Sequence, residues 1–255
     1  MDSTDPAKSK QYLQSLAHGL AVIVAMGKSD TTSIPELAER LGMNRWLVRR
    51  VILTIEALGY VERSGRRLRL LPKVLDLGYA FLSSMELWKI ADPLIVDLVE
   101  KVRLSCTMSV LEGHDIVYIA RHTASHRIVS IPLQVGSRIP AHCTASGRVL
   151  LSDKAIDALR DWLSHAPLPK MTPLTVTDPT VLEERILETR RSGWCRVDHE
   201  LAEGSCAIAL PVRDRLGRVM AAISLSGRDE DLKMPAVLDE LQETAHRIES
   251  VIHRR

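Results

Sequence analysis

Two helical segments separated by only a few residues around Gly42 constrain the fold of this chain more than any other feature. The first segment begins at Ser33, and Glu36 three residues later completes a capping box that is typical of a helix start. Gly42 is typical of a helix C-terminus, and Asn44 is a good N-cap for a second helix. Two helices joined by so short a turn match the spacing of a helix-turn-helix.

The second of these helices sorts its side chains into two faces. At ~100° per residue, its apolar residues fall within about a third of the circumference. They are Leu47, Val48, Val51, Ile55 and Leu58. The opposite side and the cap carry polar, basic or aromatic side chains, at Asn44, Arg45, Trp46, Arg49 and Arg50. Because the second helix of such a motif reads the major groove with its N-terminal residues, we predict that these five contact double-stranded DNA.

A short basic hairpin is predicted directly after this helix. Tyr60 and Val61 begin a strand, Ser64-Gly65 supplies a turn, and the sequence RRLRL alternates back out. Such a hairpin is typical of a wing, whose arginines reach phosphates or a minor groove. The predicted wing contacts are Arg63, Arg66, Arg67 and Arg69.

Charge is distributed unevenly along the chain and supports this interpretation. Residues 1–72 contain 11 Lys and Arg against 7 Asp and Glu, whereas the remainder contains 23 against 25. A basic segment attached to a slightly acidic remainder suggests a polyanion-binding module on a body with another task. The alternative is a three-helix packing unit whose basic face is merely solvated.

Residues 73–90 have helical spacing and are predicted to form a linker helix between a DNA-binding domain, 1–72, and a second domain, 91–255. Asp92-Pro93 suggests a restart of the helix there. The linker helix is a candidate to pair with its twin in a dimer, since a single helix-turn-helix rarely binds tightly enough alone. The alternative is a helix that packs only within its own chain.

The second domain has the pattern of an antiparallel sheet with helices. Strands are expected at 106–111 and 116–121 as a hairpin, at 126–133, and at the sequences CRVDHEL, CAIALPVRD and VMAAISLSG. Helices are expected after Thr144, after Asp178 with Pro179 in the first position, and at the end of the chain. The fold class predicted for the whole chain is therefore α+β.

Three separate stretches of the second domain suggest a pocket for a small acid. Thr144 caps a short helix, Asp198 and Glu200 are expected on one side of a strand, and Ser224 and Ser226 alternate on another strand. Hydroxyl groups, a helix N-terminus and apolar walls together make an acid-binding pocket. The alternative is ordinary capping and strand polarity.

Catalysis, a metal site and a membrane span are not expected. Cys106, Cys143, Cys195 and Cys206 are scattered without metal-ligand spacing, so neither a metal nor another cofactor is predicted. Hydrolase and nucleotide-binding motifs are absent, and His142, Cys143 and Asp198 make only a chance nucleophile constellation. With no secretory signal and no apolar run of ~20 residues, we expect a cytoplasmic chain without membrane association.

Four separated motifs resemble the IclR family of bacterial transcriptional regulators, over nearly the whole chain. They are SIPELAERLGMNRWLVRRVILTIEALGYV, LPKVLDLGYAFLSS, IPAHCTASGRVLLS and VDHELAEGSCAIALPVRDRLGRVMAAISLSG. The resemblance implies a winged helix-turn-helix joined by a linker helix to a GAF-like effector domain. It also implies dimers or tetramers, and repression or activation modulated by a small organic acid. RNA polymerase would be a further partner if the protein is an activator.

The same resemblance implies that three pairs of residues line the effector pocket, with Cys206 and Ala207 close to it. The pairs are Ala145 and Ser146, Asp198 and Glu200, and Ser224 and Ser226. His142, Cys143 and Thr144, which directly precede Ala145 in the sequence, are further candidates for the same pocket. The motifs are most similar to the branch that regulates aromatic-acid catabolism, with protocatechuate, hydroxybenzoate or β-ketoadipate as effectors. The alternatives are a regulator of glyoxylate or sugar-acid metabolism, and a small-acid-binding protein or enzyme with an incidental basic domain. Ser205 and Cys206 stand where that branch tends to carry Leu-Arg, which favours a ligand less charged than a dicarboxylate.

Overall fold

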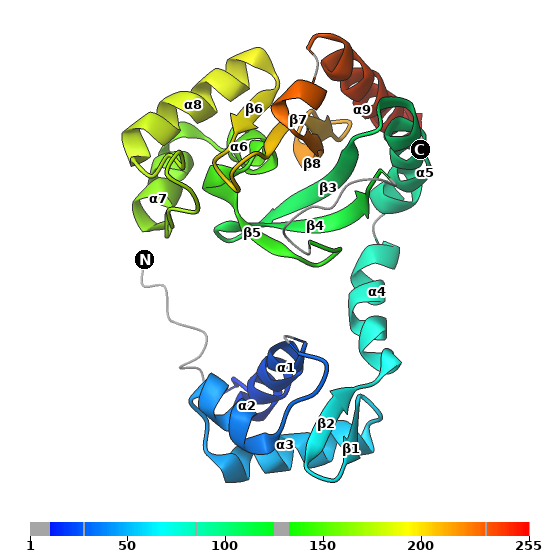
Figure 1. Ribbon diagram of the computed structural model, residues 1–255, viewed down its shortest axis with the longest axis vertical. Helices are drawn as coiled ribbons and strands as arrows, with labels where there is room; N and C mark the ends of the chain where they lie inside the picture. Colours follow the sequence, from blue (N-terminus) through cyan, green and yellow to red (C-terminus); the bar gives the residue numbers. More distant parts are fainter. Residues whose placement is uncertain (1–10, 28, 85, 125–132, 233, 255) are drawn as a thin grey trace. The chain divides into compact units, whose positions relative to one another are not determined.

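The structure, a computed structural model, describes residues 11–254 except 28, 85, 125–132 and 233. The chain divides into two compact units, unit 1 (Met1–Leu82) and unit 2 (Ser83–Arg255) (Figure 1). The strand expected at 126–133 falls almost wholly outside the described residues. Among the described residues, no helix is long and apolar enough to cross a bilayer.

Unit 1 is a winged helix-turn-helix. Its elements are α1 (Gln14–Met26), α2 (Ile34–Leu41), α3 (Arg45–Ala57), β1 (Val61–Ser64), β2 (Arg67–Leu70), a 3-10 turn η2 (Pro72–Val74) and the start of α4 (Leu75–Ser84). The predicted capping box of Ser33 and Glu36 is present, and Gly42 adopts the left-handed conformation that ends α2. Asn44 caps α3 through its side chain. The local signals in the sequence therefore set the helix boundaries.

One apolar cluster holds the three helices and the hairpin of unit 1 together. α1 contributes Val22 and Met26, α2 contributes Leu37, and α3 contributes Val48 and Ile52, all buried. β1 and β2 pair antiparallel as predicted, and a bridge from Thr32 to Leu68 ties the hairpin to the segment before α2. The hairpin is thus fixed on the same core as the helix-turn-helix.

Unit 2 is a six-stranded antiparallel sheet in the order β5-β4-β3-β8-β7-β6. The strands are β3 (Ser105–Glu112), β4 (Asp115–His122), β5 (Arg138–Pro140), β6 (Cys195–Asp198), β7 (Cys206–Arg213) and β8 (Val219–Gly227). The helices are α5 (Glu86–Val102), α6 (Ala145–Leu151), α7 (Ile156–His165), α8 (Pro179–Ser192) and α9 (Ala236–Arg254), with 3-10 turns η3 (Ala141–Cys143) and η4 (Asp229–Asp231). The predicted α+β class is confirmed.

The sheet separates two layers of helices. α5 and α9 pack together and against β3, β4, β7 and β8 (Figure 1). On the other face, α6, α7 and α8 share an apolar cluster with Ala209 of β7 and Ala222 of β8. The small side chains on that face leave room next to the sheet at its β3-β8-β7 centre.

Several elements of unit 2 differ from the expectations drawn from the sequence. The patterns did not predict the short edge strand β5 or the helix α7. The restart expected at Asp92-Pro93 does not occur, because α5 continues through Pro93. A proline removes only one backbone hydrogen bond, and packing of Ala91, Ile95 and Leu98 in the interior stabilises the helix on both sides of it.

Candidate functional site

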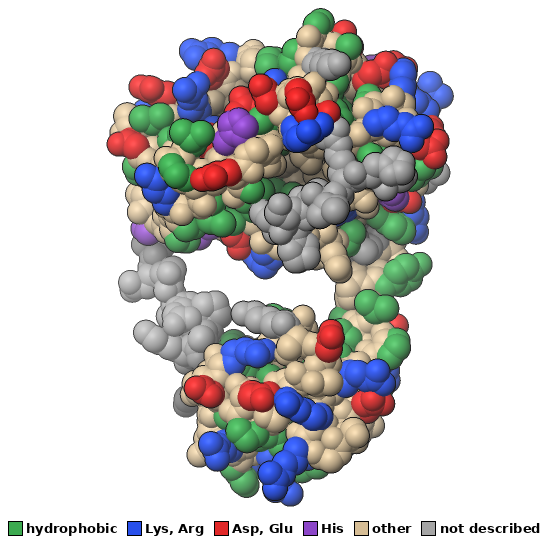
Figure 2. Space-filling model, in the orientation of Figure 1, with side chains coloured by type: hydrophobic (Ala, Val, Ile, Leu, Met, Phe, Trp, Pro, Cys, Tyr) green, Lys and Arg blue, Asp and Glu red, His purple; other side chains and the backbone are tan. Residues whose placement is uncertain are grey.

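The outward side of α3 is exposed and basic. Asn44 Oδ1 accepts a hydrogen bond from the backbone N–H of Trp46 at 2.8 Å, which fixes the start of the helix. Trp46 is 62% exposed, and the Arg50 guanidinium lies 4.6 Å from the centroid of its ring. Arg45 and Arg49 are also exposed. Figure 2 shows Lys and Arg side chains gathered on the part of unit 1 that carries α3.

Three of the four predicted wing arginines are engaged in ion pairs within unit 1. Arg63 pairs with Glu56, Arg67 with Glu36 and Arg69 with Glu62, at 3.2, 3.4 and 2.6 Å. Arg66 has no ion pair among the described residues. Exposed pairs of this kind contribute only about 0–1 kcal/mol, so their arginines can exchange a carboxylate for a phosphate at little cost.

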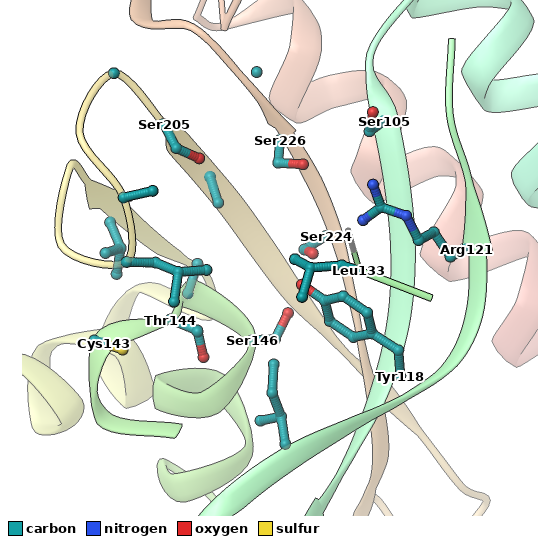
Figure 3. Close-up of a pocket in the computed structure, with 18 of the residues that line it drawn as sticks. Ser105, Tyr118, Arg121, Leu133, Cys143, Thr144, Ser146, Ser205, Ser224 and Ser226 are labelled. Atoms are coloured by element: carbon teal, nitrogen blue, oxygen red, sulfur yellow. The ribbon is translucent and has the colours of Figure 1, made fainter. Parts of the chain in front are cut away.

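A cavity of 540 Å³ lies on the face of the unit 2 sheet that carries α6 (Figure 3). Hydroxyl groups and apolar side chains dominate its wall. The lining residues are Ser105, Ile116, Tyr118, Arg121, Leu133, Cys143, Thr144, Ala145, Ser146, Val197, Leu201, Ala202, Glu203, Gly204, Ser205, Ala207, Ser224, Ser226, Gly227 and Arg228. Seven of the eleven predicted pocket residues are therefore brought together: Cys143, Thr144, Ala145, Ser146, Ala207, Ser224 and Ser226.

The floor of the cavity is a row of small polar side chains on neighbouring strands. Ser226 of β8 lies opposite Ser105 of β3 and Ala207 of β7. Two residues earlier on β8, Ser224 is opposite Thr107, and the two hydroxyls are hydrogen bonded at 2.8 Å. The predicted common face of Ser224 and Ser226 is confirmed, because residues two apart on a strand point the same way.

A β-bulge brings Tyr118 and Arg121 to the same wall of the cavity. In a regular strand, residues three apart face opposite sides of the sheet. Here Tyr118 pairs with Ser109 and Ala120 pairs with Met108, so Ile119 is an extra residue that reverses the alternation. Both side chains consequently point into the cavity from β4 (Figure 3). Strict alternation in the sequence misses Arg121 for this reason.

Arg121 is the half-buried cation of this wall. None of the ion pairs among the described residues involves its guanidinium. The cavity has two other charged lining residues. Arg228 is already ion-paired, with Glu230 at 2.6 Å and with Asp231 at 3.1 Å. Glu203 is an acid on the loop between β6 and β7. Burial also raises the pKa of Tyr118, so its phenol stays protonated and can donate a hydrogen bond.

The N-terminus of α6 forms the opposite wall. The Thr144 hydroxyl accepts a hydrogen bond from the Gly147 N–H at 3.0 Å, as the capping prediction requires. A Cβ at Gly147 would lie 2.0 Å from the carbonyl oxygen of Ala141, so only glycine lets the helix approach the preceding turn this closely. This approach places Ala145 and Ser146 on the cavity surface.

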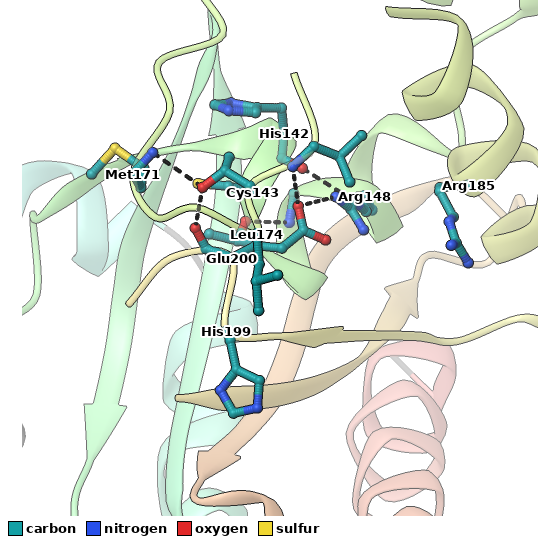
Figure 4. Close-up of polar contacts among 12 residues, drawn as sticks. His142, Cys143, Arg148, Met171, Leu174, Arg185, His199 and Glu200 are labelled. Carbon is teal, nitrogen blue, oxygen red and sulfur yellow. Dashed lines mark hydrogen bonds and ion pairs between the residues drawn. The ribbon is translucent and has the colours of Figure 1, made fainter. Parts of the chain in front are cut away.

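Glu200 is not on the cavity wall, contrary to prediction. Strand β6 ends at Asp198, and His199 follows with a positive φ of 60°, so Asp198 and Glu200 do not share a strand face. The Glu200 carboxylate instead accepts hydrogen bonds from Arg148 at 2.7 Å and from the Val176 N–H at 2.9 Å (Figure 4). Arg148 and Glu200 are both buried, so this is an interior ion pair that anchors the segment before the 201–205 loop.

Asp198 and Cys206 also lie off the cavity wall. Asp198 is exposed and pairs with Arg196 at 2.8 Å. Cys206 is buried beside His199, and burial raises the pKa of its thiol to about 11. The ligand atoms of Asp198, Cys206 and Asp229 lie within 4.8 Å of one another, close enough for a metal ion. Arg196, however, already pairs with both carboxylates and supplies the positive charge there.

His142 and Cys143 do not form a nucleophile constellation with Asp198. His142 is directed to the carbonyl oxygen of Pro169 at 3.1 Å, and burial lowers its pKa. The Cys143 thiol donates to the Pro140 carbonyl, and burial raises its pKa to about 12, so it carries almost no thiolate at neutral pH. His142 therefore supports the turn before α6 rather than lining the cavity.

The fold and these sites define a DNA-binding transcriptional regulator with a separate small-molecule cavity. Residues 79–250 match the family described as bacterial transcriptional regulator IclR, C-terminal, and the chain belongs to the IclR family. It is 41% identical over 216 residues to the Pca regulon regulatory protein of Pseudomonas putida, covering 84% of this chain and 74% of that protein. This membership makes it a regulator and not an enzyme.

Two further relatives carry names that refer to hydroxybenzoate. The p-hydroxybenzoate hydroxylase transcriptional activator of Acinetobacter baylyi is 29% identical over 259 residues, covering 98% of this chain and 96% of that protein. The crystal structure of an IclR homologue from Microbacterium hydrocarbonoxydans, complexed with 4-hydroxybenzoate, is 25% identical with a TM-score of 0.82, covering 93% of this chain and 98% of that chain.

Proposed function

We propose that this regulator controls catabolic genes in response to a small aromatic monocarboxylic acid, of the hydroxybenzoate type, bound in the unit 2 cavity. The observation that carries the proposal is the position of Arg121. Its guanidinium, with no ion pair among the described residues, faces a cavity lined mainly by hydroxyl and apolar groups. The other charged lining residues are Glu203 and Arg228, and Arg228 is already paired with Glu230 and Asp231. A carboxylate satisfies this cation with two parallel hydrogen bonds.

The other walls suit the remainder of such a ligand. Ile116, Leu133 and Val197 supply apolar surface for a ring. Ser146, Ser224, Ser226 and the Tyr118 phenol supply hydrogen-bond partners for a ring hydroxyl. With one cation that lacks an acidic partner, the cavity favours a monocarboxylate over a dicarboxylate, which agrees with the expectation drawn from Ser205 and Cys206. The names of two relatives support the same ligand class.

The DNA contacts we propose are those of α3 and the wing. Asn44, Arg45, Trp46, Arg49 and Arg50 form one exposed basic surface, to which the hairpin adds Arg63, Arg66, Arg67 and Arg69. Contacts between these side chains and phosphates predict an affinity for duplex DNA that falls steeply as salt rises. The operator would lie on cytoplasmic DNA.

A homo-oligomer is supported by apolar side chains that unit 1 leaves exposed. Leu16, Leu20 and Val24 form a stripe along α1, and α4 exposes Leu75, Leu77, Tyr79 and Phe81. Apolar side chains that form a contiguous exposed surface are typical of a protein–protein interface. Pairing of two chains through residues 73–90 would present two α3 helices to two half-sites.

The mechanism we propose is a population shift. The effector must bind more tightly to one arrangement of the paired DNA-binding units, since equal affinity for both arrangements changes nothing. If the ligand-bound form activates transcription, RNA polymerase is a further partner.

Thermal unfolding with a panel of acids tests the effector class. The panel contains 4-hydroxybenzoate, protocatechuate, β-ketoadipate, shikimate, glyoxylate and pyruvate, with 4-hydroxybenzamide as the uncharged isostere. We expect saturable stabilisation by an aromatic acid, about 2.7 kcal/mol at a hundredfold excess over Kd, and none by the amide. Equal stabilisation by acid and amide would contradict the role of Arg121, and stabilisation by β-ketoadipate or glyoxylate instead would contradict the ligand class.

A further inference from the structure

Trp46 and Arg50 point away from the core of unit 1 more directly than the other basic or aromatic residues of α3. The buried face of the helix is formed by Val48, Val51, Ile52 and Ile55. At ~100° per residue, Trp46 and Arg50 lie within about 30° of the direction opposite to that face. By the same arithmetic, Arg49 lies about 70° and Arg45 about 110° from that direction. A helix in a groove directs its outermost side chains to the base edges and its flanking ones to the phosphates.

The Arg50 guanidinium is held in place before any DNA is bound. It lies 4.6 Å from the centroid of the Trp46 ring, and the backbone of Trp46 is itself fixed by the Asn44 cap. None of the ion pairs among the described residues involves Arg50, in contrast to Arg63, which a carboxylate holds. Stacking on an indole orients the planar guanidinium and lowers the entropy lost when it binds.

We propose that Arg50, oriented by Trp46, reads a guanine in the major groove of the operator, while Arg45 and Arg49 contact phosphates. This inference rests on the DNA binding proposed above. The planar fork of an arginine donates to both O6 and N7 of guanine, the most common specific contact in DNA recognition. Methionine has a side chain of similar reach without any hydrogen-bond donor, so Arg50→Met removes the base contact, and comparison with Arg49→Ala separates base reading from the loss of one charge.

Selection from a library of random duplexes with the full chain tests the assignment. The unsubstituted protein should enrich duplexes with a guanine at a fixed position of each half-site. Replacing that guanine by 7-deazaguanine removes N7 and should weaken binding roughly five- to a hundredfold. Arg50→Met should lose both the enrichment and this discrimination. Trp46→Ala should reduce the discrimination, and Trp46→Phe should retain most of it because a ring remains under the guanidinium.

Arg49→Ala is the matched control. It should weaken binding to all duplexes alike and reduce the slope of log affinity against log salt by about 1, with the guanine preference unchanged. If Arg50→Met selects the same sequences and 7-deazaguanine has no effect, Arg50 does not read the guanine although DNA binding stands. If the unsubstituted chain binds no duplex in a salt-dependent way, the proposed function itself fails and this inference falls with it.

Discussion

The outward surface of α3 and the cavity of unit 2 are built in opposite ways. The surface of α3 comes from a single run of residues, 44–50, whose side chains are mostly exposed and leave the core of unit 1 to other positions. The cavity is assembled from β3, β4, β8, α6 and the 201–205 loop, segments far apart in the sequence. Buried polar groups such as Arg148 and Glu200 fix those segments next to it. We therefore expect that the residues proposed to contact DNA can be substituted with little loss of stability, whereas the surroundings of the cavity cannot.

The two units should differ most in the stability lost when an ion pair is broken. Arg148→Met leaves the Glu200 carboxylate buried without its partner, and we expect unfolding in urea to show a loss of about 3–5 kcal/mol. Arg67→Ala removes an exposed pair with Glu36 in unit 1 and should cost less than about 1 kcal/mol. Arg148→Met combined with Glu200→Leu should recover part of the loss. Equal small losses in both units would remove the distinction between them.

Two glycine-to-alanine substitutions should have effects of opposite sign. Gly147→Ala forces a Cβ against the Ala141 carbonyl, so it should destabilise unit 2 by about 1–3 kcal/mol and weaken effector binding. Gly19→Ala in α1 meets nothing within 4 Å and should stabilise unit 1 by about 0.5–1 kcal/mol. Thermal unfolding of both variants measures this, and a neutral Gly147→Ala would show that the close approach of α6 is dispensable.

Asn44 is the exception among the exposed α3 residues, because we expect its substitution to lower stability. It is a predicted DNA contact and also the side-chain cap of α3, so Asn44→Ala should lower the stability of unit 1 by about 0.5–2 kcal/mol. Asn44→Ser keeps a capping oxygen and should retain most of that stability while changing the group that faces DNA. Comparing both variants by unfolding and by duplex binding separates the two roles; identical behaviour of Ala and Ser would contradict the capping role.

The smallest expected effect is a pH dependence that originates at His142. Burial lowers the pKa of His142 in the folded chain, so the unfolded chain binds a proton that the folded chain does not. Stability should therefore fall as pH drops below about 6.5, the ordinary pKa of histidine. His142→Asn should lose less stability between pH 7.5 and 5.5 than the unsubstituted chain. An equal loss in His142→Asn and the unsubstituted chain would argue against a neutral buried imidazole.

The difference between the α3 surface and the cavity also decides how much of each could be predicted from sequence. Capping boxes, helix-ending glycines and strand alternation are local, so the helix-turn-helix, the wing and the hairpin of β3 and β4 follow from the pattern of residues. The common face of Ser224 and Ser226 follows from the same alternation. These features require no knowledge of what lies across the fold.

Other parts of the cavity depend on tertiary structure that local patterns do not encode. Arg121 reaches the wall only because Ile119 is bulged, and no residue type near it signals a bulge. Glu200 leaves the strand at His199 and pairs with Arg148, more than fifty positions earlier. A buried carboxylate requires a buried cation, but the sequence does not say which arginine provides it.

We propose that an aromatic acid held by Arg121 changes the DNA affinity of this chain. The direct measurement is the affinity for a duplex selected by the full chain, with and without 4-hydroxybenzoate, for the unsubstituted protein and for Arg121→Gln. We predict that the acid changes the affinity of the unsubstituted protein by about 5- to 150-fold, and that Arg121→Gln binds the duplex equally well without responding to the acid. No response in the unsubstituted protein would show that the acid does not control DNA binding, and an equal response in Arg121→Gln would show that Arg121 does not hold the acid.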